Sequence, residues 1–243
     1  MSTPLQRMLG AALAGTLGAG SLLAAEEPRQ PWSPGIETSG YEWNQMRGEK
    51  LIALSQQGDP LRGEIAYEVC KGCHEADARG EIDGSYPRLA GQHATVLIKQ
   101  LTDVRAGVRD NQKMYPYANE HVITPQEIAD IAIYLQGLQA PAENGLGSGE
   151  RLQRGDDLYG DHCKECHGRH GEGDADGFYP RVGRQHYAYL LREARMIRDG
   201  ERRNAHPEMV DVIDSYSEDD LAAVADYMSR LPGARTEASA KSP

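Results

Sequence analysis

Apolar residues recur at helical spacing in paired segments of the chain. Residues 124–138 begin with Thr-Pro-Gln-Glu, a capping box with proline in the first turn, and continue with apolar positions at the period of a helix. Residues 217–231 repeat this pattern. Two further helices are expected at 92–106 and 185–199, each ending before a glycine. The pattern predicts an all-α protein in which each helix has a later counterpart.

The likeness between the two halves extends beyond the helices. The first cysteine of each half lies at positions 70 and 163, and 163 minus 70 gives an offset of 93 residues. This offset carries Tyr-Pro-Arg at 86–88 onto Tyr-Pro-Arg at 179–181. Tandem self-similarity of this kind indicates two domains of the same fold. We assign them to residues 60–140 and 154–232, joined by a linker at 141–153.

All four cysteines of the chain fall in these repeats, each pair followed at once by a histidine. A Cys-x-x-Cys turn alone would suit a redox dithiol or half of a zinc site, but the adjoining histidine makes it the c-type haem attachment signature. Two thiols about one helical turn apart can each form a thioether to a haem vinyl group, with the histidine as proximal iron ligand. We therefore expect two covalently attached haem c groups, held by Cys70, Cys73 and His74 and by Cys163, Cys166 and His167.

Each domain has only about eighty residues, which is small for a hydrophobic core. The buried haem must therefore supply a large part of each core. We expect each domain to be a few helices packed around one attached haem.

The N-terminal residues of the chain predict export. Residues 1–25 carry one basic residue and then an apolar stretch rich in Gly, Ala and Leu, which is typical of a secretory signal peptide. The alternative is an uncleaved membrane anchor. Both place the remainder outside the cytoplasm, so we expect a periplasmic protein, membrane-associated if the segment is retained. Residues 26–59 form an N-terminal extension that contains both tryptophans and a short helix within 44–57, and the sequence assigns this extension no function. Residues 233–243 are expected to form a disordered tail.

Each iron needs a second axial ligand. Downstream of the haem turn the first domain has one methionine, Met114, in the loop before the last helix. In the second domain Met209 lies in the matching loop, whereas Met196 and Met228 fall within predicted helices. Histidine and methionine together raise the reduction potential, which suits an electron carrier. The predicted ligand pairs are His74 with Met114 and His167 with Met209.

The two methionines do not align under the repeat offset, because 114 plus 93 is 207, two positions before Met209. Either the loop path differs between the domains, or one iron takes a histidine such as His121 or His206. His93 and His186 recur at the starts of the middle helices, where we interpret them as helix-end residues.

The cysteine turns, the Tyr-Pro-Arg that follows them, the methionine loop and the final helix together resemble the dihaem cytochromes of the cytochrome c4 family, over residues 61–231. The resemblance implies two class I cytochrome c folds packed face to face, passing single electrons between periplasmic or membrane-bound partners such as an oxidase or reductase. It also implies three pairs of residue roles. The carbonyls of Pro87 and Pro180 would fix the proximal histidines, Arg88 and Arg181 would contact haem propionates, and Gly63 and Gly155 would lie where the first and last helices of each domain cross.

The charge balance bears on partners. The chain has 26 Lys and Arg against 37 Asp and Glu, a net charge of −11 at pH 7. Such acidity argues against nucleic acid as a partner. It favours a redox protein with a basic docking face, or it serves only to keep an exported protein soluble.

The function expected from these features is electron transfer without catalysis. Haem attachment uses every cysteine, and each domain has a methionine that would close its iron to substrates. Two alternatives remain at this point. One is the electron-accepting subunit of a larger oxidoreductase, and the other is a dihaem enzyme, a peroxidase or a thiosulfate-oxidising cytochrome, with one open iron.

Overall fold

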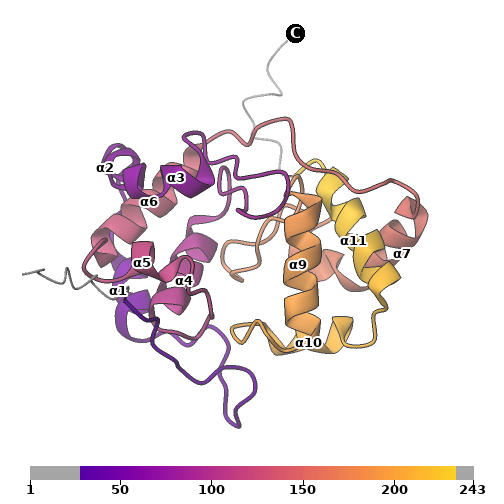
Figure 1. Ribbon diagram of the computed structural model, residues 1–243, viewed down its shortest axis with the longest axis horizontal. Helices are drawn as coiled ribbons and strands as arrows, with labels where there is room; N and C mark the ends of the chain where they lie inside the picture. The colour runs from indigo at the N-terminus through magenta and orange to yellow at the C-terminus, as the bar shows by residue number, and fades with distance from the viewer. Residues whose placement is uncertain (1–27, 234–243) are drawn as a thin grey trace, which may run out of the picture.

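The computed structural model describes residues 28–233 and shows two helical lobes side by side (Figure 1). Among these residues the only β pairing is an isolated bridge between Asp174 and Tyr179. No helix in this part of the chain has the length and apolar character needed to cross a membrane. The predicted signal peptide, and all but the first residue of the predicted tail, lie outside the described residues.

The helices of the two lobes follow the predicted order. In the first lobe they are α1 (Gly48–Ser55), α2 (Pro60–Ala66), the 3-10 turn η1 (Tyr67–Val69), α3 (Lys71–His74), α4 (Ala94–Arg105), α5 (Tyr115–Ala118) and α6 (Pro125–Gly137). In the second they are α7 (Leu152–His162), α8 (Lys164–His167), α9 (Tyr187–Arg198), α10 (Pro207–Ile213) and α11 (Glu218–Arg230).

The capping boxes form at the helix starts that the sequence predicts. Thr124 and Glu127 form a reciprocal capping box at the start of α6, and Ser217 and Asp220 form one at the start of α11. Each box satisfies two backbone N–H groups that have no partner inside the helix. These caps fix where the last helix of each lobe begins.

The first and last helices of each lobe cross at a glycine. A Cβ added to Gly63 would lie 2.1 Å from the carbonyl oxygen of Asp130 in α6. A Cβ added to Gly155 would lie 2.3 Å from that of Ala223 in α11. Both distances are far below van der Waals contact, so only glycine allows α2 to approach α6 and α7 to approach α11 this closely. The glycine positions implied by the resemblance are confirmed.

Each lobe has a hydrophobic cluster of its own, and the two clusters share no residue. The first centres on Tyr67, Ile128 and Leu135, and the second on Leu221 and Ile213. Both clusters include the first cysteine of a haem turn. The core of each lobe is thus built around its attachment site.

The N-terminal extension belongs to the folded structure. Its helix α1 packs against α4 and α6, with Ala53 fully buried in the first core. Residues 28–47, which precede α1, contact both lobes. The short helix predicted within 44–57 is confirmed as α1.

The crossing glycines lead to a stability prediction within one helix. We expect Gly155→Ala to lower the free energy of unfolding by about 3 kcal/mol, because the new methyl group would overlap the backbone of α11. Gly160→Ala is the matched control in α7, since a Cβ there meets nothing within 4 Å. It should stabilise the protein by up to about 1 kcal/mol through helix propensity. Guanidinium denaturation of both variants tests this, and equal effects would contradict the crossing geometry.

Candidate functional site

The two haem turns are short helical turns with the cysteines and the histidine on one side. The amide of His74 donates to the carbonyl of Cys70 at 3.0 Å, and that of His167 to Cys163 at 2.9 Å. This single turn of helix brings each first cysteine and its histidine close together. None of the four cysteines forms a disulfide.

The two histidines are held in one tautomer. Nδ1 of His74 lies 3.1 Å from the carbonyl oxygen of Pro87, and Nδ1 of His167 lies 3.0 Å from that of Pro180. A carbonyl only accepts, so Nδ1 must carry the proton and Nε2 keeps a free lone pair. Burial lowers the pKa of both histidines, which favours the neutral ring that binds a metal.

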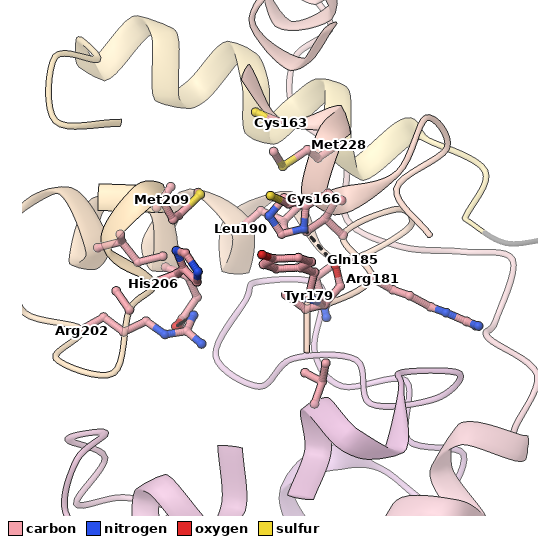
Figure 2. Close-up of a pocket in the computed structure, with 18 of the residues that line it drawn as sticks. Cys163, Cys166, Tyr179, Arg181, Gln185, Leu190, Arg202, His206, Met209 and Met228 are labelled. Carbon is pink, nitrogen blue, oxygen red and sulfur yellow. Dashed lines mark hydrogen bonds and ion pairs between the residues drawn. The ribbon is translucent and has the colours of Figure 1, made fainter. Parts of the chain in front are cut away.

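A cavity of about 400 Å³ adjoins the second histidine. Its walls include Cys163, Cys166, His167, Met209 and Met228 (Figure 2). Burial raises the pKa of the Cys163 thiol to about 12 and that of Cys70 to about 11, so these sulfurs lie in apolar surroundings that disfavour a thiolate. A thioether carries no charge and suits this setting.

The methionines lie at different points of their local helices. Met114 is the N-cap of α5 and is half-buried, whereas Met209 lies within the first turn of α10. Under the repeat offset the N-cap of α10, His206, corresponds to residue 113, so the two helix starts differ by one position, and Met209 lies three residues after its N-cap whereas Met114 is itself an N-cap. In Figure 2 Met209 lies on the wall formed by α10, and Met228 lies on α11 near Cys163.

The two histidines considered as alternative ligands lie in different settings. The side chain of His121 is 87% exposed and points to solvent. His206 lines the cavity of the second lobe, with its Nδ1 accepting from the amide of Glu208 at 3.2 Å. The assignment of Met114 and Met209 as iron ligands remains a prediction.

Arg88 and Arg181 reach across to the opposite lobe. Nη2 of Arg88 donates to the carbonyl of Gly183 at 2.8 Å, and Nη1 of Arg181 donates to that of Gly91 at 2.7 Å. Nη1 of Arg88 and Nε of Arg181 are buried without a partner. Buried donors of this kind need an acceptor, and a carboxylate such as a haem propionate is suited to the role. Their contact with propionates remains a prediction.

Comparison with known proteins agrees with this geometry. The cytochrome c family profile matches residues 61–139 and again residues 152–232. Cytochrome c4 of Pseudomonas aeruginosa is 31% identical over 184 residues, which cover 72% of this chain and 89% of that protein. The chain belongs to the cytochrome c4 family.

Two further relatives extend the comparison. The crystal structure of reduced recombinant cytochrome c4 from Pseudomonas stutzeri superposes with a TM-score of 0.65 at 27% identity, covering 72% of this chain and all of that one. A protein of Stutzerimonas stutzeri named thiosulfate dehydrogenase electron acceptor is 30% identical over 205 residues, covering 76% of this chain and 94% of that protein.

Membership of the cytochrome c4 family establishes three of the expectations from the sequence. The protein has two tandem cytochrome c domains, it carries two covalently attached haem c groups, and it transfers electrons without being an enzyme. The two attachment turns described above fit these groups, because each has two cysteines outside any disulfide and a histidine whose Nε2 is available.

In this cytochrome c4 the two lobes meet through hydrogen bonds that repeat with the same offset. The side chain of Gln92 donates to the carbonyl of Arg181 at 3.0 Å, and that of Gln185 donates to the carbonyl of Arg88 at 2.9 Å. In return, the amides of the two arginines donate to the glutamine oxygens. The interface therefore has an approximate twofold arrangement.

His93 and His186 extend this twofold pattern. Nε2 of His93 donates to the carbonyl of Glu172 at 2.8 Å, and Nε2 of His186 donates to that of Arg79 at 2.7 Å. Both histidines occupy the helix-end positions predicted for them, but neither side chain caps its helix. Sequence reasoning missed their role between the lobes. The sequence shows that Gln-His recurs at the start of both middle helices, but it does not indicate which groups these side chains contact.

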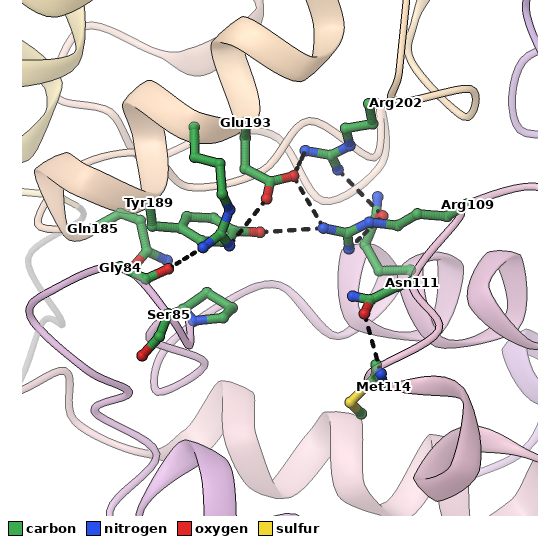
Figure 3. Close-up of polar contacts among 12 residues, drawn as sticks. Gly84, Ser85, Arg109, Asn111, Met114, Gln185, Tyr189, Glu193 and Arg202 are labelled. Atoms are coloured by element: carbon green, nitrogen blue, oxygen red, sulfur yellow. Dashed lines mark hydrogen bonds and ion pairs between the residues drawn. The ribbon is translucent and has the colours of Figure 1, made fainter. Parts of the chain in front are cut away.

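A buried ionic cluster breaks the twofold symmetry (Figure 3). Glu193 accepts from Arg109 at 3.1 Å and from Arg202 at 2.8 Å. Its counterpart in the first domain is Gln100, since 100 plus 93 is 193, and this neutral side chain accepts from the same two arginines. Burial alone would raise the pKa of Glu193, but the charges of Arg109, Arg202 and Arg192 outweigh it and hold the pKa below its ordinary value of 4.5.

Glu193 is therefore expected to stabilise the contact between the lobes in a pH-dependent way. Replacing it in Glu193→Gln leaves two buried guanidinium groups without an anion and should cost about 2 to 4 kcal/mol at neutral pH. Because the folded pKa is lowered, this contribution is present above the ordinary pKa and is lost as pH falls through the lowered one. Denaturation of both proteins between pH 7 and pH 3 measures it. Glu201→Gln, at an exposed position, is the control, and a difference that does not depend on pH would contradict the assignment.

Proposed function

We propose that this cytochrome c4 is a periplasmic carrier of single electrons whose two irons are closed by Met114 and Met209. The observation that supports the proposal most directly is that His167 and Met209 line the same cavity, to whose wall the first lobe also contributes residues such as Leu89 and Val96. In the first lobe Met114 lies in the loop before the last helix and its amide donates to Oδ1 of Asn111 at 3.1 Å. Export is supported by the signal-like pattern of residues 1–25.

Haem c would supply a one-electron couple, and a methionine ligand together with the histidine would raise its potential. The protein contributes the neutral histidine with a fixed tautomer and an apolar cluster beside it. A closed iron has no free position at which a small molecule can bind. These conditions favour outer-sphere transfer over catalysis.

Opening the second iron tests the ligand assignment. We expect the wild-type ferric protein to bind no cyanide on the time scale of mixing, and Met209→Ala to bind one equivalent per chain, because the sixth position becomes free. Met228→Leu is the matched control, since Met228 lines the same cavity and its counterpart in the first domain is leucine. The assignment is wrong if Met228→Leu opens an iron and Met209→Ala does not, as followed by absorption spectroscopy.

We further propose that the electron donor is a dehydrogenase of the kind that oxidises thiosulfate. The support is the named thiosulfate dehydrogenase electron acceptor, whose length is almost fully covered by this chain. It corresponds to the alternative reading of the sequence as an electron-accepting subunit, and it is compatible with a diffusible carrier.

The outer face of α2 has the character of a docking surface for such a donor. Leu61, Ile65 and Val69, spaced four residues apart, are 73%, 74% and 43% exposed and lead directly into the first haem turn. Exposed Glu64 and Glu68 accompany them, together with exposed Arg62 and with Lys71, which pairs with Glu68. An apolar centre surrounded by charges of both signs suits a partner whose electron-exit face is apolar.

The rate of electron uptake should depend on this face and on salt. Ile65→Ser should lower the second-order rate with a thiosulfate-oxidising dehydrogenase about tenfold, through lost apolar contact. In the wild type the rate should fall as ionic strength rises, because the chain's net charge of −11 steers a partner of opposite charge. Leu146→Ser, at another exposed leucine in the linker, should leave the rate unchanged. Stopped-flow reduction measures these rates, and equal effects of the two substitutions would rule out this docking face.

A further inference from the structure

Residues 28–47, which we call the strap, precede α1 and lie outside both matches to the cytochrome c family. They contact the first lobe at the loop after α4 and the second lobe at the loop before α10. These are the loops that lead to Met114 and Met209. One segment of chain therefore reaches both candidate ligand loops.

In the first lobe the strap acts through Gln30. Its side-chain amide donates to the carbonyl of Val104 at 2.6 Å and to that of Arg109 at 2.7 Å, and its oxygen accepts from the amide of Asn111 at 2.8 Å. Asn111 in turn accepts from the amide of Met114. Gln30 is thus one residue removed from the predicted ligand.

The middle of the strap joins the two loops to each other. Ser33 binds the loop after α4, with its amide 3.2 Å from the carbonyl of Gly107. The guanidinium of Arg203, in the second lobe, donates to the carbonyls of both Ser33 and Gly107. The amide of Ile36 donates to the carbonyl of Arg203 at 2.9 Å. These contacts link the two lobes through the strap.

In the second lobe the strap acts through Trp43. The Trp43 ring packs edge-on against His206, with ring centroids 4.3 Å apart, and stacks on Tyr179 at 6.0 Å. Trp43 also lines the cavity that contains His167 and Met209. It spans the edge of that cavity between Tyr179, which follows the haem turn, and His206, which precedes Met209 by three residues.

The first lobe closes the equivalent edge without a tryptophan. Under the repeat offset Lys113 corresponds to His206 and Tyr86 to Tyr179. There the ammonium of Lys113 lies over the Tyr86 ring, 4.1 Å from its centroid. In the second lobe Tyr179 and His206 also lie against each other, with ring centroids 5.9 Å apart, and Trp43 packs against both. The second haem pocket therefore takes an additional wall residue from the strap, whereas at this edge the first lobe uses its own loop.

We propose that the strap positions the two methionine loops, Gln30 for the loop of Met114 and Trp43 for the loop of Met209, and so maintains the methionine–iron bonds. The inference rests on the proposed ligand assignment. It makes Trp43 and Gln30 positioning residues, since neither contributes an atom to the iron.

The test compares two tryptophans of the same strap in the haem-loaded protein. Trp32 is 68% exposed and its ring lies over the guanidinium of Arg203, so Trp32→Ala removes a strap contact without opening the cavity. In the reduced state each iron-bound methionine has its own proton resonance, shifted upfield by the porphyrin ring current. Met209→Ala identifies the resonance of the second lobe.

We expect Trp43→Ala to lose the Met209 resonance and its far-red band at a lower temperature than the wild type does. The same substitution should lower the reduction potential of that haem alone. Gln30→Ala should do the same for Met114, and Trp32→Ala should move neither. If the wild type shows both methionine resonances but Trp43→Ala and Trp32→Ala change the temperature of their loss equally, the strap's role is wrong while the ligand assignment stands. A missing resonance in the wild type would overturn the ligand assignment and the strap's role together.

Discussion

The hydrogen bond from each proximal histidine to a proline carbonyl is the contact on which the rest of the structure depends. It decides which ring nitrogen carries the proton, and therefore which one can bind iron. It also ties the haem turn to the segment that follows it, because Pro87 lies 13 residues after His74 and Pro180 lies 13 after His167. The same segments carry Arg88 and Arg181 into the contact between the lobes, so histidine orientation and domain packing share one piece of backbone.

The twofold likeness of the lobes makes their differences informative. The glutamine, arginine and histidine contacts across the interface occur in matched pairs, as expected for two copies of one unit facing each other. Two of the exceptions are the Glu193 position, where one copy has a carboxylate and the other an amide, and the edge covered by Trp43. Such differences give the two haems unequal electrostatic and packing environments, which is a physical route to unequal potentials.

Much of the fold follows from local rules that can be read along the chain. Capping boxes, glycine stops and helical periodicity place α4, α6, α9 and α11, and the cysteine spacing predicts the attachment turns. The interface roles of His93 and His186 could not be predicted, because they depend on how two separate domains face each other. The same holds for Trp43, whose partners lie 136 and 163 residues further along the chain, since 179 minus 43 is 136 and 206 minus 43 is 163. Long-range side-chain contacts leave no periodic signal.

We propose that both haems are closed by a histidine and a methionine, so that the protein carries two single electrons. A spectroelectrochemical titration of the intact protein tests this ligation, with the far-red methionine-to-iron band measured per haem as each is reduced. We expect two band equivalents per chain, each lost in a one-electron step. One equivalent, or a haem that titrates without any such band, would contradict it.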